Sequence, residues 1–150
     1  MFAIYQKNIH RKMKYFTLRE LTKSPTADRL KIDNTPDEKT KKNLIELVDT
    51  VLDPLREAYG HPIIVTSGYR CPKLNSAVGG VKNSQHVLGQ AADIRSVSDS
   101  VKDNKAIFDL AVKLMKEGKI KTGQIIDEYG YNWIHISTPG GHVNQILHIK

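Results

Sequence analysis

The sequence predicts an α+β domain with a small antiparallel sheet and helices packed on one face. Helical spacing of apolar residues dominates the first part of the chain, and three strand-like runs close it. The first two of these runs flank a tight turn around Gly130, which is typical of a β-hairpin. At 150 residues, the chain has the length of one domain with a core of its own.

We expect residues 1–12 to be an N-terminal appendage and residues 13–150 to form a single domain, because the first clear helix signal follows Met13. The opening residues contain neither a sustained apolar stretch nor a small-residue cleavage site, so we expect no secretory signal. Since no apolar run approaches the roughly 20 residues of a membrane helix, we also expect no membrane insertion.

Two helices are expected in the first half of the chain. One begins within residues 16–21, where a threonine and a glutamate have the spacing of a capping box. After a polar connection over residues 24–36, a longer helix is expected to begin at Thr35 as its N-cap, with a kink at Pro54 and an end before Gly60. Its buried stripe is expected to contain Leu44, Leu47, Val48, Val51, Leu52 and Leu55.

Strands and one more helix are expected in the second half. Residues 63–66 are β-branched and predict a buried strand, and residues 91–94 predict its return to the sheet. Between them, residues 71–90 are rich in Gly, Asn and Ser, which indicates a long functional loop. Residues 103–116 have the periodicity of a second core helix. The closing strands are expected at residues 124–129, 132–137 and 143–149.

Composition excludes several classes of protein. Cys71 is the single cysteine, so an intrachain disulfide and a cysteine-based zinc finger are ruled out, and we interpret it as a small apolar filler. The net charge of +7 favours polyanionic surroundings. However, the lysines are scattered over helix faces with little aromatic interleaving, so we do not expect a nucleic-acid partner.

Two segments carry candidate metal ligands. SQHVLGQAADI places His86 and Asp93 around small residues that allow a tight loop, and WIHIS alternates so that His135 faces away from Ile134 and Ile136. Three nitrogen and oxygen ligands leave one open position on a tetrahedral zinc, as catalytic sites require. Four other histidines are available as substitutes, of which the first is the best placed: His142, His10, His61 and His148.

TSGYR, SQHVLGQAADI, QIIDEY and WIHIS resemble, in the same order, the motifs of the M15 family of zinc peptidases. This family contains D-alanyl-D-alanine carboxypeptidases and phage endolysin peptidases that share a fold with the hedgehog signalling domain. The resemblance covers residues 16–137. It implies that His86, Asp93 and His135 bind Zn²⁺. It also implies that Arg70 binds substrate or steadies the oxyanion, and that Ser84 bonds within the zinc loop or to substrate.

The catalytic carboxylate is less clearly defined. One branch of the family has a glutamate three residues before the last histidine, where this chain has Asn132. Asp127 and Glu128 are the acids just upstream. An even-numbered hairpin loop would pair Glu128 with Trp133, diagonal to His135 on one face of the sheet, and leave Asp127 exposed. A three-residue loop would present Asp127 instead. The QIIDEY pattern favours Glu128.

The resemblance implies a zinc-dependent peptidase that hydrolyses peptidoglycan stem peptides, either as a D-Ala-D-Ala carboxypeptidase or as an L-Ala-D-Glu-type endopeptidase. The alternative is a non-catalytic, zinc-stabilised module of the same fold that binds cell wall or protein. We expect a monomer that is made in the cytoplasm and acts at the bacterial cell wall. A phage lysis protein or a virion-associated protein would reach the wall without a secretory signal.

Overall fold

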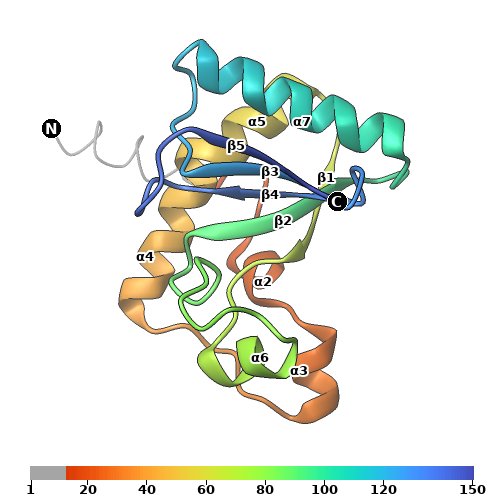
Figure 1. Cartoon of the computed structure of the whole chain (residues 1–150). Coiled ribbons are helices and arrows are strands. Elements are labelled where there is room, and N and C mark those ends of the chain that lie inside the picture. Colours follow the sequence, from red (N-terminus) through yellow and green to blue (C-terminus); the bar gives the residue numbers. More distant parts are fainter. Residues whose placement is uncertain (1–12) are drawn as a thin grey trace, which may run out of the picture.

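A five-stranded sheet lies at the centre of the fold (Figure 1). The computed structural model describes residues 13–150, so the predicted appendage lies outside the described residues. The order of the strands is β1-β2-β4-β3-β5. Their bounds are β1 (Ile63–Ser67), β2 (Ala91–Ser96), β3 (Gln124–Glu128), β4 (Trp133–Ser137) and β5 (Gln145–Ile149).

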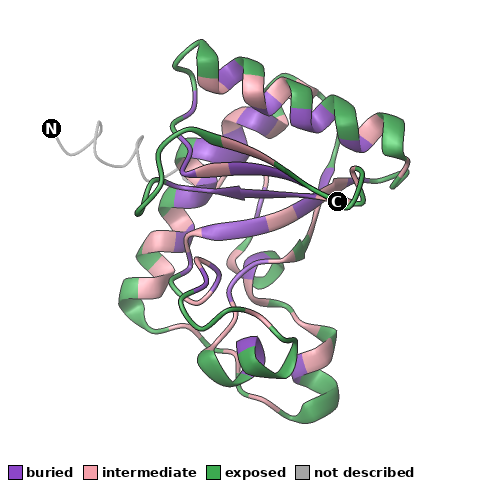
Figure 2. Ribbon diagram, in the orientation of Figure 1, coloured by how far each residue is buried: buried purple, intermediate pink, exposed green. Residues whose placement is uncertain are grey.

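The long helices pack against one face of this sheet and bury one apolar core with it, which confirms the predicted α+β class. Helix α7 (Val101–Lys116) lies above the sheet in Figure 1, and the buried residues of Figure 2 gather where helices and strands meet. Ile94, Ile134 and Ile136 supply the core side of the central strands. The other helical elements are α2 (Leu18–Thr22), α3 (Pro25–Leu30), α4 (Glu38–Leu47), the π-helix η1 (Val48–Leu52), α5 (Asp53–Tyr59) and α6 (Pro72–Ala77).

The start and the middle of the long helical segment differ from expectation. Asp37, not Thr35, is the N-cap of α4, because its carboxylate accepts a hydrogen bond from the Thr40 amide. Thr35 instead donates its hydroxyl hydrogen to Asp33. The irregularity expected at Pro54 takes the form of the wider π-helical turn η1 just before it. A proline ring clashes with the carbonyl of the preceding turn, and a wider turn relieves that contact.

Two short helices were missed. Within residues 24–36, the Ser24 hydroxyl accepts a hydrogen bond from the Ala27 amide and caps α3, with a proline in its first turn. Within the predicted loop 71–90, Cys71 has the same role for α6, because its Sγ accepts from the Leu74 amide at 3.4 Å. Cys71 is therefore a half-buried helix cap and not simply an apolar filler. Both helices are too short to show a periodic apolar pattern.

The last strand departs from the antiparallel sheet that the sequence predicts. The pairs β1–β2, β2–β4 and β3–β4 are antiparallel, whereas β5 pairs with β3 in parallel. After β4, residues 138–144 pass the beginning of β3, where the Asn144 and Gln145 amides donate to the Thr122 and Gly123 carbonyls. This connection is long enough to pass over one strand, so β5 joins the far edge of β3.

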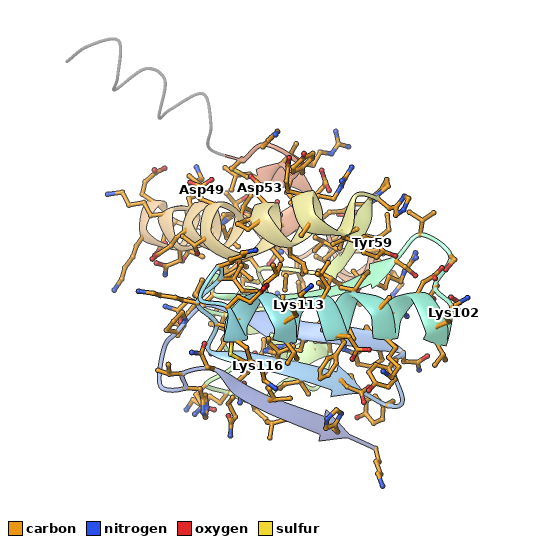
Figure 3. All side chains as sticks on the ribbon, turned by 90° about the horizontal axis from the view of Figure 1, so that it is seen from above. Asp49, Asp53, Tyr59, Lys102, Lys113 and Lys116 are labelled. Atoms are coloured by element: carbon orange, nitrogen blue, oxygen red, sulfur yellow. The ribbon has the colours of Figure 1, made fainter. Side chains whose placement is uncertain are left out.

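The beginning of the described chain is fixed to the helix formed by η1 and α5. Asp53 accepts hydrogen bonds from the amides of Lys14 and Tyr15 at 2.6 and 3.0 Å, and Asp49 accepts one from the Met13 amide at 2.8 Å. Figure 3 shows both carboxylates on the side where the described chain starts. Burial raises the pKa of Asp53, and the two amide hydrogen bonds oppose this. These contacts connect residues 13–15 to the core.

The outer surfaces of the helices are polar, as the scattered lysines predict. Lys102, Lys113 and Lys116 are exposed along α7 (Figure 3). Across residues 13–150, no helix combines the length and the apolar character that crossing a membrane demands.

Candidate metal centre

Three side chains from separate segments converge on the face of the sheet opposite the long helices. Asp93 on β2 pairs directly with His135 on β4, and His86 lies in the loop before β2. Oδ1 of Asp93 is 3.3 Å from Nε2 of His86 and 3.1 Å from Nδ1 of His135. The three ligand atoms lie within 4.8 Å of one another. The structure therefore brings together the three residues that the sequence predicts as metal ligands.

The donor set fits zinc. Two imidazole nitrogens and one carboxylate oxygen are ligands that zinc prefers, and three of them leave one position of a tetrahedron open. His86 Nδ1 lies 2.7 Å from the Gly68 carbonyl oxygen. Because a carbonyl only accepts, Nδ1 carries the hydrogen, and in the neutral ring Nε2 has the lone pair that faces Asp93. Such a second hydrogen bond is usual for a metal-binding histidine.

The charge of the cluster also suits a cation. Burial by itself would raise the pKa of Asp93, but the facing rings of His135 and His86 outweigh burial and hold the pKa well below its ordinary value. The Asp93 carboxylate is therefore ionised at neutral pH. A metal ion binds neutral imidazoles, so the cluster would offer it one negative charge and two nitrogen lone pairs.

Gly68 positions the carbonyl that orients His86. Strand β1 contains a register irregularity between Val65 and Ser67, which changes the direction of the chain just before Gly68. The Gly68 backbone passes so close to α2 that a Cβ would lie 2.2 Å from the Leu21 carbonyl oxygen. The next amide, that of Tyr69, donates to this same oxygen at 2.7 Å. Only glycine fits at this contact.

We expect Gly68→Ala to lower both stability and zinc affinity. The added methyl group collides with backbone, which should cost about 1–3 kcal/mol in the free energy of unfolding. It should also displace the carbonyl that holds the His86 ring. Denaturant unfolding of the metal-free protein and zinc titration against a competing chelator measure the two effects.

The matched control is Gly118→Ala. Gly118 also has an unusual backbone, with φ +73°, but a Cβ there has nothing within 4 Å. The Gly118→Ala variant should lose about 1 kcal/mol in the free energy of unfolding through backbone strain, and its zinc affinity should not change. Equal zinc affinities for the two variants would show that Gly68 has no part in orienting His86.

The loop that carries His86 is supported by α4. Gly89 has φ +70°, and a Cβ there would lie 2.9 Å from the Thr40 carbonyl oxygen, so both conformation and space require glycine. The Asn43 side chain donates to the Leu88 carbonyl at 2.9 Å. These contacts fold residues 84–90 tightly enough for His86 and Asp93 to meet.

Ser84 and Arg70 both form hydrogen bonds with the backbone of His86. The Ser84 hydroxyl accepts a hydrogen bond from the His86 amide at 3.2 Å, and the Arg70 amide donates to the His86 carbonyl at 3.1 Å. Nε of Arg70 is buried and has no hydrogen-bond partner among residues 13–150. Burial lowers the pKa of Arg70, and the charge of Asp93 opposes this.

The hairpin has the even-numbered register. Glu128 pairs with Trp133 and Asp127 pairs with Ile134, so successive acids point to opposite faces. Glu128 shares the metal-site face with His135. Burial raises its pKa, the charge of Asp93 raises it further, and the histidines oppose the rise.

Asp127 lies on the other face and is buried, not exposed as expected. Its carboxylate accepts a hydrogen bond from the Tyr131 amide at 2.5 Å and lies 3.1 Å from Nδ1 of His148. It therefore stabilises the hairpin and the edge strand.

A cavity of about 580 Å³ opens beside the three converging side chains. Arg70, Ser84 and Glu128 line it together with the three candidate ligands, and Tyr129 and Trp133 supply an aromatic wall with ring centroids 5.3 Å apart. A smaller cavity of about 230 Å³ also borders Arg70 and Asp93. Space for a ligand is therefore present on two sides of Arg70.

The substitute histidines lie elsewhere. His142 lines the large cavity but is exposed and does not join the cluster of ligand atoms. His148 contacts Asp127, His61 is exposed beside Tyr59, and His10 lies outside the described residues. Sequence reasoning missed Gly68 and Gln85 as groups that contact the candidate ligands, because a backbone carbonyl and an amide in a loop have no periodic signal.

The fold and the donor set together define an α+β domain with a candidate metal centre whose donors suit zinc. The family model described as Peptidase M15 matches residues 14–137. No curated protein matches the chain. The chain belongs to the peptidase M15 family, whose members are zinc-dependent metallopeptidases that act on cell-wall peptides.

Proposed function

We propose that this protein is a zinc-dependent peptidase that hydrolyses peptidoglycan stem peptides. The observation that carries the proposal is the convergence of His86, Asp93 and His135 beside a cavity that Glu128 and Arg70 also line. Family membership supports the reaction class. Glu128 lies on the same face and is not a candidate ligand, so its carboxylate supports catalysis over metal binding alone.

His86 Nε2, Asp93 Oδ1 and His135 Nδ1 would hold the zinc. When bound, zinc lowers the pKa of a water molecule toward about 7 and polarises a carbonyl group. The protein contributes orientation, because the Gly68 carbonyl orients His86 and the β2–β4 pairing places Asp93 opposite His135 before any metal arrives.

Glu128 would transfer the proton. A hydrolysed peptide bond needs a base that takes a proton from the attacking water and returns it to the leaving amine. Glu128 is half-buried at the cavity, and its raised pKa brings its two protonation states closer in free energy near neutral pH. Such a group exchanges protons in both directions more readily than an ordinary glutamate.

Arg70 would bind the substrate. A guanidinium group offers several donors in a fixed plane, which suits a carboxylate or a developing oxyanion. Nε of Arg70 has no hydrogen-bond partner among residues 13–150, and two cavities adjoin Arg70, which is consistent with a substrate that passes it. Ser84 has one contact already, to the His86 amide, and lines the same cavity, so it would support the loop and border the substrate.

Mass spectrometry of muropeptides after digestion of purified peptidoglycan tests the proposal. We expect new products that disappear with a chelator and return with added zinc. Loss of a terminal D-alanine would identify a carboxypeptidase, whereas release of a peptide cut between L-Ala and D-Glu would identify an endopeptidase. Unchanged masses with zinc bound and peptidoglycan retained would instead identify the non-catalytic binding module.

A further inference from the structure

The second ring nitrogen of His135 has a specific neighbour. Nε2 of His135 lies 3.3 Å from Oε1 of Gln85, which precedes His86 in the loop. His135 is buried, with its other nitrogen directed at Asp93. Gln85 therefore contacts a residue 50 positions away that belongs to the candidate metal centre.

This contact provides the acceptor that His135 needs when its Nδ1 binds a metal. A neutral imidazole has one N–H group and one lone pair. If Nδ1 supplies the lone pair to a metal, Nε2 must carry the hydrogen and needs an acceptor. Oε1 of Gln85 is that acceptor. With the amide turned over, an NH₂ group would face the N–H of Nε2, and two donors would oppose each other.

Gln85 is held in place for this contact. Its backbone carbonyl accepts hydrogen bonds from the amides of Leu88 and Gln90 at 3.2 and 3.0 Å. Its Nε2 atom is buried and has no partner in the described part of the chain. The hydrogen bond to His135 is thus the one side-chain hydrogen bond of Gln85 that residues 13–150 provide.

We propose that Gln85 is a positioning residue of the metal centre, whose Oε1 holds His135 in the tautomer that directs the Nδ1 lone pair at zinc. The Gly68 carbonyl has the equivalent role for His86. This inference rests on the metal centre of the proposed function, but it does not require that the protein cleave peptides.

Zinc affinity of three variants tests this role, with zinc alone as the probe and a competing chelator as the reference. Gln85→Met keeps the approximate length of the side chain and removes the acceptor, and we expect a loss of about 10–100-fold. Gln85→Glu restores an acceptor and should bind zinc at least as tightly as the parent. The control is Gln90→Met, the same change in the same loop without contact to a ligand, and it should leave affinity unchanged.

Nitrogen-15 NMR of the zinc-loaded parent provides a measurement that does not depend on the folding of any variant. We expect His135 to carry its hydrogen on Nε2. A hydrogen on Nδ1, parent-like affinity of Gln85→Met, or equal weakening of the Met and Glu variants would each overturn the proposal. Failure of muropeptide cleavage with these zinc results intact would refute the peptidase function alone.

Discussion

Replacing Glu128 with glutamine should lower kcat by about 10²–10⁴-fold while zinc stays bound. An amide of the same shape cannot accept and return a proton, and general acid–base catalysis contributes this much. The three candidate ligands do not include Glu128, so their geometry should be retained. Steady-state kinetics on a soluble stem peptide, with zinc content measured on the same sample, checks both parts.

The matched control is Asp127→Asn. This is the neighbouring acid, but it points to the opposite face and contacts Tyr131 and His148. We expect kcat to stay close to that of the parent, with a modest loss of stability. A reversed outcome, in which Asp127→Asn is inactive and Glu128→Gln is active, would mean that the base is misassigned.

The pH dependence gives a second check on Glu128. Burial raises the pKa of Glu128, so in the metal-free protein its carboxyl should titrate at a higher pH than an ordinary glutamate, which carboxyl NMR would measure. In the zinc-loaded enzyme, kcat/KM should fall on acidification as Glu128 becomes protonated. Activity should be present above the pKa that Glu128 has with zinc bound, where the carboxylate is ionised, and should decline below it. The residual activity of Glu128→Gln should lack this acidic limb.

Replacing Asp93 with asparagine should reduce zinc affinity by more than about 100-fold. Losses of up to about this size follow even when a residue that only hydrogen-bonds to a ligand is replaced. The change removes the one carboxylate among the candidate ligands, whose pKa lies well below its ordinary value. Hydrolysis should fall in step with zinc content. Elemental analysis after dialysis and a chelator titration measure the loss.

Asp109→Asn controls for the removal of a carboxylate. Asp109 is exposed on α7, where it pairs with Lys105 at 2.6 Å, so its loss should leave zinc content unchanged. Circular dichroism should show that both variants retain the fold. An Asp93→Asn protein with stoichiometric zinc and full activity would contradict the assigned ligand set.

The core of the fold was predictable because buried apolar residues recur at regular spacing along helices and strands. The apolar stripe that includes Leu44, Leu47 and Val51 is fully buried, and the alternation of Ile134 with His135 separates core from site as expected. The parallel pairing of β5 with β3 could not be predicted, since the alternation of apolar and polar residues in an edge strand is the same at either edge of the sheet. Thr35 was misassigned because both Thr35 and Asp37 are good caps, and only contacts decide between them.

The candidate ligands were predictable for a related reason. Strand alternation and short spacing limit where His135, Asp93 and His86 can point. The groups that orient them are different, because the carbonyl of Gly68 and the amide of Gln85 act through tertiary contacts 18 and 50 residues apart in sequence. Such contacts depend on the path of the whole chain.

Because Asp93 pairs with His135, binding of a cation would depend on how β2 and β4 are aligned. A slip of one residue between these strands would turn His135 into the apolar interior and expose an isoleucine in its place. Misaligned chains would then lack a ligand and gain nothing from zinc. Supplying the metal during refolding should therefore enrich the correctly aligned population at the expense of slipped ones.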